Sequence, residues 1–76
     1  MSDLTRLGEY FEKKSVNKAS VARKTGLGKN RLTAITTSDT ARLTAEELYL
    51  IALAMEVNPG ELLEYVCGHL TLEKDS

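Results

Sequence analysis

Apolar residues fall into short stretches with the spacing of one helix face, and polar or glycine-containing breaks separate these stretches. The first stretch occupies the i, i+3, i+4 and i+7 positions of a helix, with Leu4, Leu7, Gly8 and Phe11. Ser2 or Asp3 can cap this helix, which is expected to end near Lys14. Tyr10 of the same helix is compatible with packing or with a phosphate contact through its hydroxyl, and packing is the favoured interpretation.

Two shorter helices are predicted on either side of a glycine turn. Asn17 is suited to cap a helix over residues 18–25. Gly26 can end that helix, because glycine takes positive φ without strain at Cβ, and the next helix begins at Gly28 or Lys29. The inward-facing positions of the pair are Val21, Ala22, Thr25, Leu27, Leu32 and Ile35.

Two further helices follow a polar segment. Residues 36–42 have no apolar period and are expected to form a loop. Thr44 and Glu47 form a capping-box pair before residues 48–55, which are apolar almost all round and therefore suited to burial on several sides. A second capping box covers residues 58–61, with proline at the first helical position.

The end of the chain has a different pattern. The fifth helix is expected to stop at Gly68, and in residues 69–76 Leu70 and Leu72 alternate with polar residues. This tail is compatible with a short strand, a dimer arm or a disordered segment. The pattern as a whole predicts a compact all-α domain of five helices over residues 1–68, followed by the tail.

Composition narrows the class of protein. The 76 residues allow one domain, and 42% hydrophobic residues with no Trp and one Phe indicate a mostly aliphatic core. One cysteine excludes an intramolecular disulfide and a cysteine-based zinc site. No apolar run approaches a membrane span and no signal-peptide pattern is present, so a soluble cytoplasmic protein is expected.

Charge is strongly segregated along the chain, although the formal net charge is only −1. Residues 13–42 hold eight Lys or Arg against one Asp, whereas residues 43–76 hold seven acidic residues against one Lys. A basic face of this kind is the electrostatic footprint of phosphate binding. The alternative is a solvated basic surface without a partner.

The spacing around Gly26 is typical of a helix-turn-helix, in which two helices cross closely through a short turn. Ala22 supplies the small residue and Gly26 the turn four residues later. The alternative is an αα-corner that binds no ligand. The segment resembles the lambda-repressor-like, Cro-type helix-turn-helix family, also called the XRE family, and residues 51–57 and 58–63 resemble that family's fourth-helix ending and fifth-helix start. The similarity covers about residues 4–66.

This resemblance implies sequence-specific binding to double-stranded DNA, usually as a dimer and usually to regulate transcription. The sequence departs from the family pattern at three places. Lys18 stands where Gln is frequent, Gly28 stands where Ser or Thr is frequent, and the Glu and Gly expected near Thr36 and Ser38 are missing.

Candidate DNA contacts lie on the solvent side of the third helix and around it. Asparagine can pair with adenine and lysine can donate to guanine, so the predicted base-reading residues are Lys29, Asn30, Thr33 and Ala34. The predicted phosphate-binding residues are Lys18, Arg31, Thr36, Thr37 and Arg42.

The chain has more apolar residues than a small core can bury, which predicts a homodimer through Leu50, Leu53 and Tyr65. The alternative is that these residues are buried within the monomer. Cys67 and His69 make no catalytic or metal-binding constellation, so no enzyme activity, cofactor or metal is expected. The leading hypothesis is a repressor that binds a two-fold operator as a dimer and associates with the nucleoid, one version being an antitoxin with a toxin partner. The alternative is a protein-interaction module that uses its fourth and fifth helices and does not read DNA.

Overall fold

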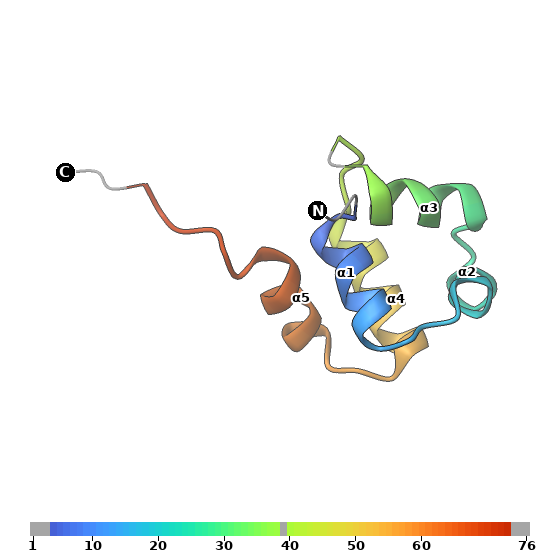
Figure 1. The fold of residues 1–76 in the computed structure, drawn as a ribbon. Helices are drawn as coiled ribbons and strands as arrows, with labels where there is room; N and C mark the ends of the chain where they lie inside the picture. The colour runs from blue at the N-terminus through green and yellow to red at the C-terminus, as the bar shows by residue number, and fades with distance from the viewer. Residues whose placement is uncertain (1–3, 39, 74–76) are drawn as a thin grey trace.

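The structure, a computed structural model, describes residues 4–38 and 40–73. These residues form five helices and no strand. The helices are α1 (Arg6–Lys13), α2 (Lys18–Thr25), α3 (Lys29–Thr37), α4 (Ala45–Met55) and α5 (Pro59–Cys67). Figure 1 shows α1 and α4 in the middle, α3 across one end, and α2 and α5 on opposite sides. The all-α, five-helix prediction is confirmed. Within the described ranges, no helix is long and apolar enough to cross a membrane.

The core is mostly aliphatic and draws on all five helices. Phe11, Leu32 and Leu62 have at most 2% of their surface exposed, although they come from three different helices. Tyr10 is buried as well, which confirms its interpretation as a packing residue, and its ring meets Tyr65 edge-on with 5.0 Å between ring centroids. The remaining buried apolar residues are Leu7, Val21, Ala22, Ile35, Leu48, Ile51 and Ala52.

The local caps of α2 and α4 agree with the sequence. Asn17 accepts a hydrogen bond from the Ser20 N–H at 3.1 Å. At α4 both halves of the capping box form, with Thr44 Oγ1 accepting from the Glu47 N–H at 3.1 Å and Glu47 Oε1 accepting from the Thr44 N–H at 3.0 Å.

At α5, Asn58 Oδ1 accepts from the backbone N–H groups of Gly60 and Glu61, at 2.7 and 3.2 Å, and Pro59 occupies the first helical position. The half of the predicted capping box contributed by Asn58 is therefore present.

The start of α1 differs from the prediction. The N-cap is Thr5, whose hydroxyl accepts from the Gly8 N–H at 3.1 Å and donates to the Ile35 carbonyl at 2.8 Å. Leu4 therefore precedes the helix instead of lying on its face. The predicted caps Ser2 and Asp3 lie outside the described residues. The capping bond to Gly8 is local and was missed in the sequence, whereas the second partner of Thr5 lies 30 residues away in the chain.

The predicted loop over residues 36–42 begins too early, because α3 continues to Thr37. Thr36 is completely buried, and its hydroxyl donates to the Leu32 carbonyl at 2.9 Å. Its own carbonyl accepts from the Thr5 N–H at 3.0 Å, and a Cβ on Gly8 would overlap this carbonyl oxygen. The end of α3 is thus fixed against the start of α1, and only glycine at position 8 permits that approach.

The tail leaves α5 and extends away from the helices (Figure 1). Its residues 69–73 form no strand, and Leu70 and Leu72 are 65% and 95% exposed. The strand interpretation is therefore wrong for the described part of the tail, whereas the arm and disordered interpretations stay predictions.

Candidate nucleic-acid interface

The turn between α2 and α3 depends on two glycines with positive φ. Gly26 has φ 74° and caps α2, while Gly28 has φ 86° and ψ 156° just before α3. Side chains are strained in both conformations. The turn is tightened by Thr25 Oγ1, which donates to the Val21 carbonyl at 2.7 Å and accepts from the Leu27 N–H at 3.3 Å. The predicted corner between the two helices is confirmed.

Three of the four predicted base-reading residues are exposed on the outer face of α3. Lys29, Asn30 and Thr33 are exposed, and Ala34 is half-buried. Leu32 and Ile35, on the opposite side of the helix, belong to the core. A helix of nine residues is about 14 Å long, and the major groove is wide enough to admit one. The exposed face therefore has the dimensions and the donors needed for base contacts.

The N-terminus of α3 differs from those of the other helices. Gly28 offers no side chain to its first N–H groups, whereas a side chain caps each of the other four helices, through Thr5, Asn17, Thr44 and Asn58. Uncapped N–H groups at a helix start attract anions. The positive φ at position 28 favours glycine, and this glycine leaves the first N–H groups of α3 without a side-chain cap.

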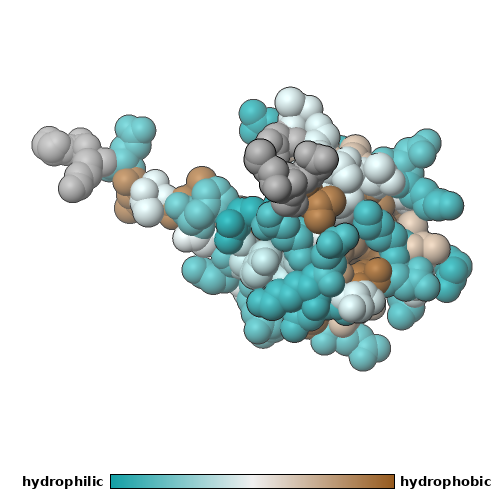
Figure 2. Space-filling view, in the orientation of Figure 1, coloured by the Kyte–Doolittle hydropathy of each residue, from teal (hydrophilic) through white to brown (hydrophobic). Residues whose placement is uncertain are grey.

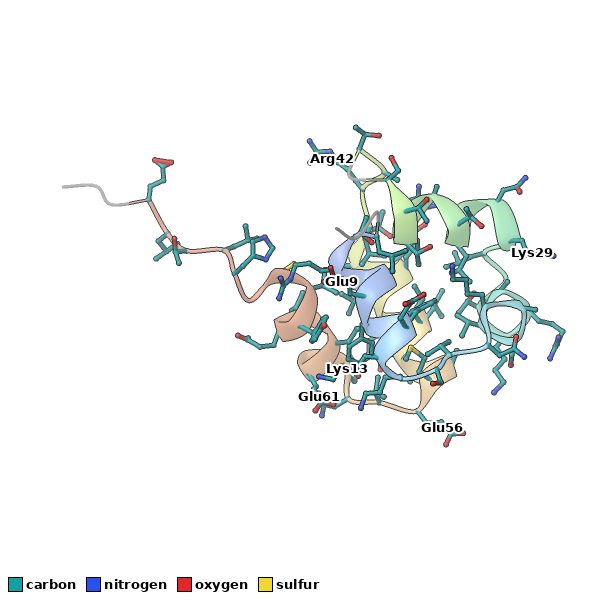
Figure 3. All side chains as sticks on the ribbon, viewed as in Figure 1. Glu9, Lys13, Lys29, Arg42, Glu56 and Glu61 are labelled. Atoms are coloured by element: carbon teal, nitrogen blue, oxygen red, sulfur yellow. The ribbon has the colours of Figure 1, made fainter. Side chains whose placement is uncertain are left out.

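Cations stand near both ends of α3, and another opens α2. Figure 3 shows Lys29 at the start of α3 and Arg42 beyond its other end, while exposed Lys18 opens α2. Residues 13–38 contain no acidic residue. Hydrophilic side chains project at the edge of the molecule where α3 begins (Figure 2). This end of the molecule is suited to an anionic ligand.

Arg31 is placed differently from the prediction of a phosphate contact. Its Nε and Nη2 donate to the Glu47 carboxylate at 2.7 and 2.8 Å, and Nη2 also donates to the Arg42 carbonyl at 2.6 Å. The guanidinium holds the pKa of Glu47 down at about 2. Arg31 therefore positions α3 against the start of α4, a role that sequence reasoning missed because Glu47 lies 16 residues further along the chain.

Two predicted phosphate-binding hydroxyls are also used within the protein. Thr36 has no exposed surface, so the prediction that it contacts phosphate is wrong. Thr37 is exposed, but its hydroxyl donates to the Thr33 carbonyl at 2.7 Å. Lys18, at the start of α2, and Arg42, after α3, are the predicted phosphate ligands whose side chains are exposed.

The predicted dimer residues divide into two groups. Leu50 and Leu53 on α4 are 39% and 54% exposed. Tyr65 is half-buried, since its ring packs on Tyr10 and lies 5.4 Å from the Arg6 guanidinium carbon. Much of the surface of Tyr65 is therefore covered within one copy of the chain.

Comparison with known proteins places the chain in a family. A family model described as the Cro/C1-type HTH DNA-binding domain matches residues 6–68. Searches of curated proteins and of solved structures gave no significant match. The matched range includes all five helices and the exposed face of α3. The chain therefore belongs to the family of Cro/C1-type helix-turn-helix domains, and its partner is DNA.

Proposed function

We propose that this protein is a sequence-specific transcriptional repressor that reads the major groove with the outer face of α3. The observation that carries this proposal is the exposed first turn of α3, where Lys29 and Asn30 project from a helix fixed at both ends. Arg31 and Glu47 hold one end, and hydrogen bonds to Thr5 hold the other. A helix fixed in this way can present its side chains to base edges with little loss of conformational entropy.

Base discrimination is assigned to the first two turns of α3. Asn30 can form two hydrogen bonds with adenine, and Lys29 can donate to the acceptors of guanine, each contact giving about 1–3 kcal/mol of discrimination. Thr33 and Ala34 offer methyl groups to thymine. Because these residues lie on one face of the helix, they can read neighbouring base pairs at once.

Affinity is assigned to the phosphate contacts around that helix. Lys18 is exposed at the start of α2 and Arg42 is exposed after α3, and the N–H groups that Gly28 leaves uncapped can bind a phosphate oxygen. Such contacts fix the position of the protein on the duplex and carry no base preference.

We further propose a homodimer on a two-fold operator, because one α3 face covers only a short site. Two copies would place their α3 helices about 34 Å apart, one DNA turn. Exposed Leu63 on α5 and Leu70 and Leu72 in the tail are available for pairing. Repression would follow from occupancy of the promoter, and an antitoxin that also binds a toxin is one version of this function.

The test is fluorescence anisotropy with a duplex selected from a random pool and with a scrambled duplex. The selected duplex should bind ~10³-fold more tightly, and affinity should fall steeply between about 50 and 200 mM salt. Asn30→Ala should relax preference at one base pair, and Lys18→Ala should weaken both duplexes about equally. Glu64→Gln, an exposed position on α5, is the control. Equal affinity for both duplexes, or identical effects of the two variants, would refute the assignment.

A further inference from the structure

A second surface lies on the outward side of α4. Tyr49, Leu50 and Leu53 are 54%, 39% and 54% exposed, and they occupy the i, i+1 and i+4 positions of one helix face. Glu46 and Glu56 stand exposed at the two ends of this apolar row. These five residues are called the α4 stripe. A hollow of about 380 Å³ opens beside it, lined by Ala45, Glu46, Tyr49 and Leu50.

The α4 stripe does not point toward the DNA-binding face. Glu47 marks the side of α4 that meets α3, through its ion pair with Arg31. At 3.6 residues per turn, Tyr49 lies about 160°, Leu53 about 120° and Leu50 about 60° around the helix from Glu47, so most of the stripe faces away from α3. A ligand on the stripe and a duplex on α3 can therefore bind at the same time.

The charge around the stripe selects the kind of partner. Residues 43–73 contain no Lys or Arg, and Figure 3 shows Glu56 and Glu61 at the end of the molecule opposite α3. If two copies paired through this stripe, Glu46 and Glu56 of one copy would face acidic side chains of the other in either orientation. Juxtaposed like charges oppose such an interface, whereas a basic partner would be attracted.

We infer that the α4 stripe docks a basic amphipathic helix of a different protein. The partner would insert two or three aliphatic side chains, one helical turn apart, against Tyr49, Leu50 and Leu53, as amphipathic helices do in apolar grooves. Lys or Arg residues flanking its apolar face would meet Glu46 and Glu56. This inference does not depend on the proposed DNA function, because the two surfaces share none of the named residues.

The probe is a fluorescein-labelled peptide of about 16 residues, long enough to form a helix, with Leu on one face and Lys or Arg elsewhere. A matched peptide carries Glu in place of the basic residues. Only the basic peptide should bind, with affinity that falls as salt rises. Leu53→Ser should weaken binding ~10-fold or more, as loss of a central apolar anchor does, and Glu46→Gln should weaken it by a smaller factor. The matched control for the charge change is Glu64→Gln, which alters an exposed glutamate on α5.

Several results would overturn the inference. These are no binding of the basic peptide up to about 1 mM, equal binding of the acidic peptide, or an equal loss of binding in Glu64→Gln and Glu46→Gln. If Leu53→Ser converted a dimer to a monomer in sedimentation experiments, the stripe would instead be assigned to contact with a second copy of the chain. Duplex binding by Leu53→Ser is measured in parallel. If Leu53→Ser keeps duplex binding but loses peptide binding, the inference is supported. If the wild-type protein binds the basic peptide but no duplex, only the proposed DNA function is refuted.

Discussion

The ion pair between Arg31 and Glu47 joins α3 to α4, and Glu47→Gln removes its charge while keeping the shape of the side chain. The Glu47 pKa lies at about 2, against an ordinary value of 4.5. At about 1.4 kcal/mol per pKa unit, the ionised carboxylate stabilises the fold by at most about 3 kcal/mol. Arg31 is 34% exposed, and solvent screening lowers the expected loss to roughly 1–2 kcal/mol. For a domain of this size the melting temperature should fall by roughly 5–15 °C.

The sign of the pH dependence follows from the direction of the pKa change. Because the Glu47 pKa is depressed in the folded chain, its contribution is fully present above the unfolded value of 4.5 and disappears as the pH falls through about 2. The difference in free energy of unfolding between the wild type and Glu47→Gln should therefore shrink below pH 4.5. At about pH 3, less than half of the difference should remain.

Urea denaturation followed by far-UV circular dichroism, at about pH 7 and about pH 3, measures this difference. Glu46→Gln makes the same charge change at the exposed neighbouring position and should cost far less. The reasoning fails if the two variants are equally destabilised at neutral pH. It also fails if the loss in Glu47→Gln is the same at both pH values.

Three further changes test how α3 packs on α1 and which polar residues near it contact DNA. Gly8→Ala should destabilise the domain by about 1–3 kcal/mol in urea denaturation, because the new Cβ would overlap the Thr36 carbonyl oxygen. The control is Gly60→Ala, where the atom nearest to a new Cβ is a side-chain oxygen 3.0 Å away. An equal loss of stability in the control would contradict this prediction. Thr36→Val should leave duplex affinity unchanged within about twofold, because Thr36 is buried. Arg42→Ala should lower the slope of log affinity against log salt concentration by about one. A changed slope in Thr36→Val would contradict the conclusion that Thr36 does not contact phosphate.

Sequence reasoning succeeded where a structural feature depends on residues within one helical turn. Asn17, Gly26 and the Thr44–Glu47 pair mark helix ends through hydrogen bonds that span only three or four residues. The exposure of Lys29 and Asn30 was also predictable, because Leu32 and Ile35 fix which side of α3 faces inward. These features need no knowledge of distant neighbours.

Sequence reasoning failed where a polar side chain is used by a distant part of the chain. Thr36 sits in a polar run that reads as a loop, yet α1 covers it, because Gly8 allows the two backbones to approach. Arg31 has the sequence context of a phosphate ligand, yet Glu47 binds it. Tyr65 packs its ring on Tyr10, and its place at a dimer surface stays a prediction.

The sequence by itself therefore determined the all-α class, the position of the helix-turn-helix and the first turn of α3 as the candidate reading surface. Periodicity and capping are local, and they act before any tertiary contact forms. The tertiary structure decided which polar side chains near α3 are free to meet DNA, because Glu47, 16 residues away, pairs with Arg31, and the start of α1 lies against Thr36. It also decided that the apolar row on α4 stays exposed, because the core is filled without Tyr49, Leu50 and Leu53.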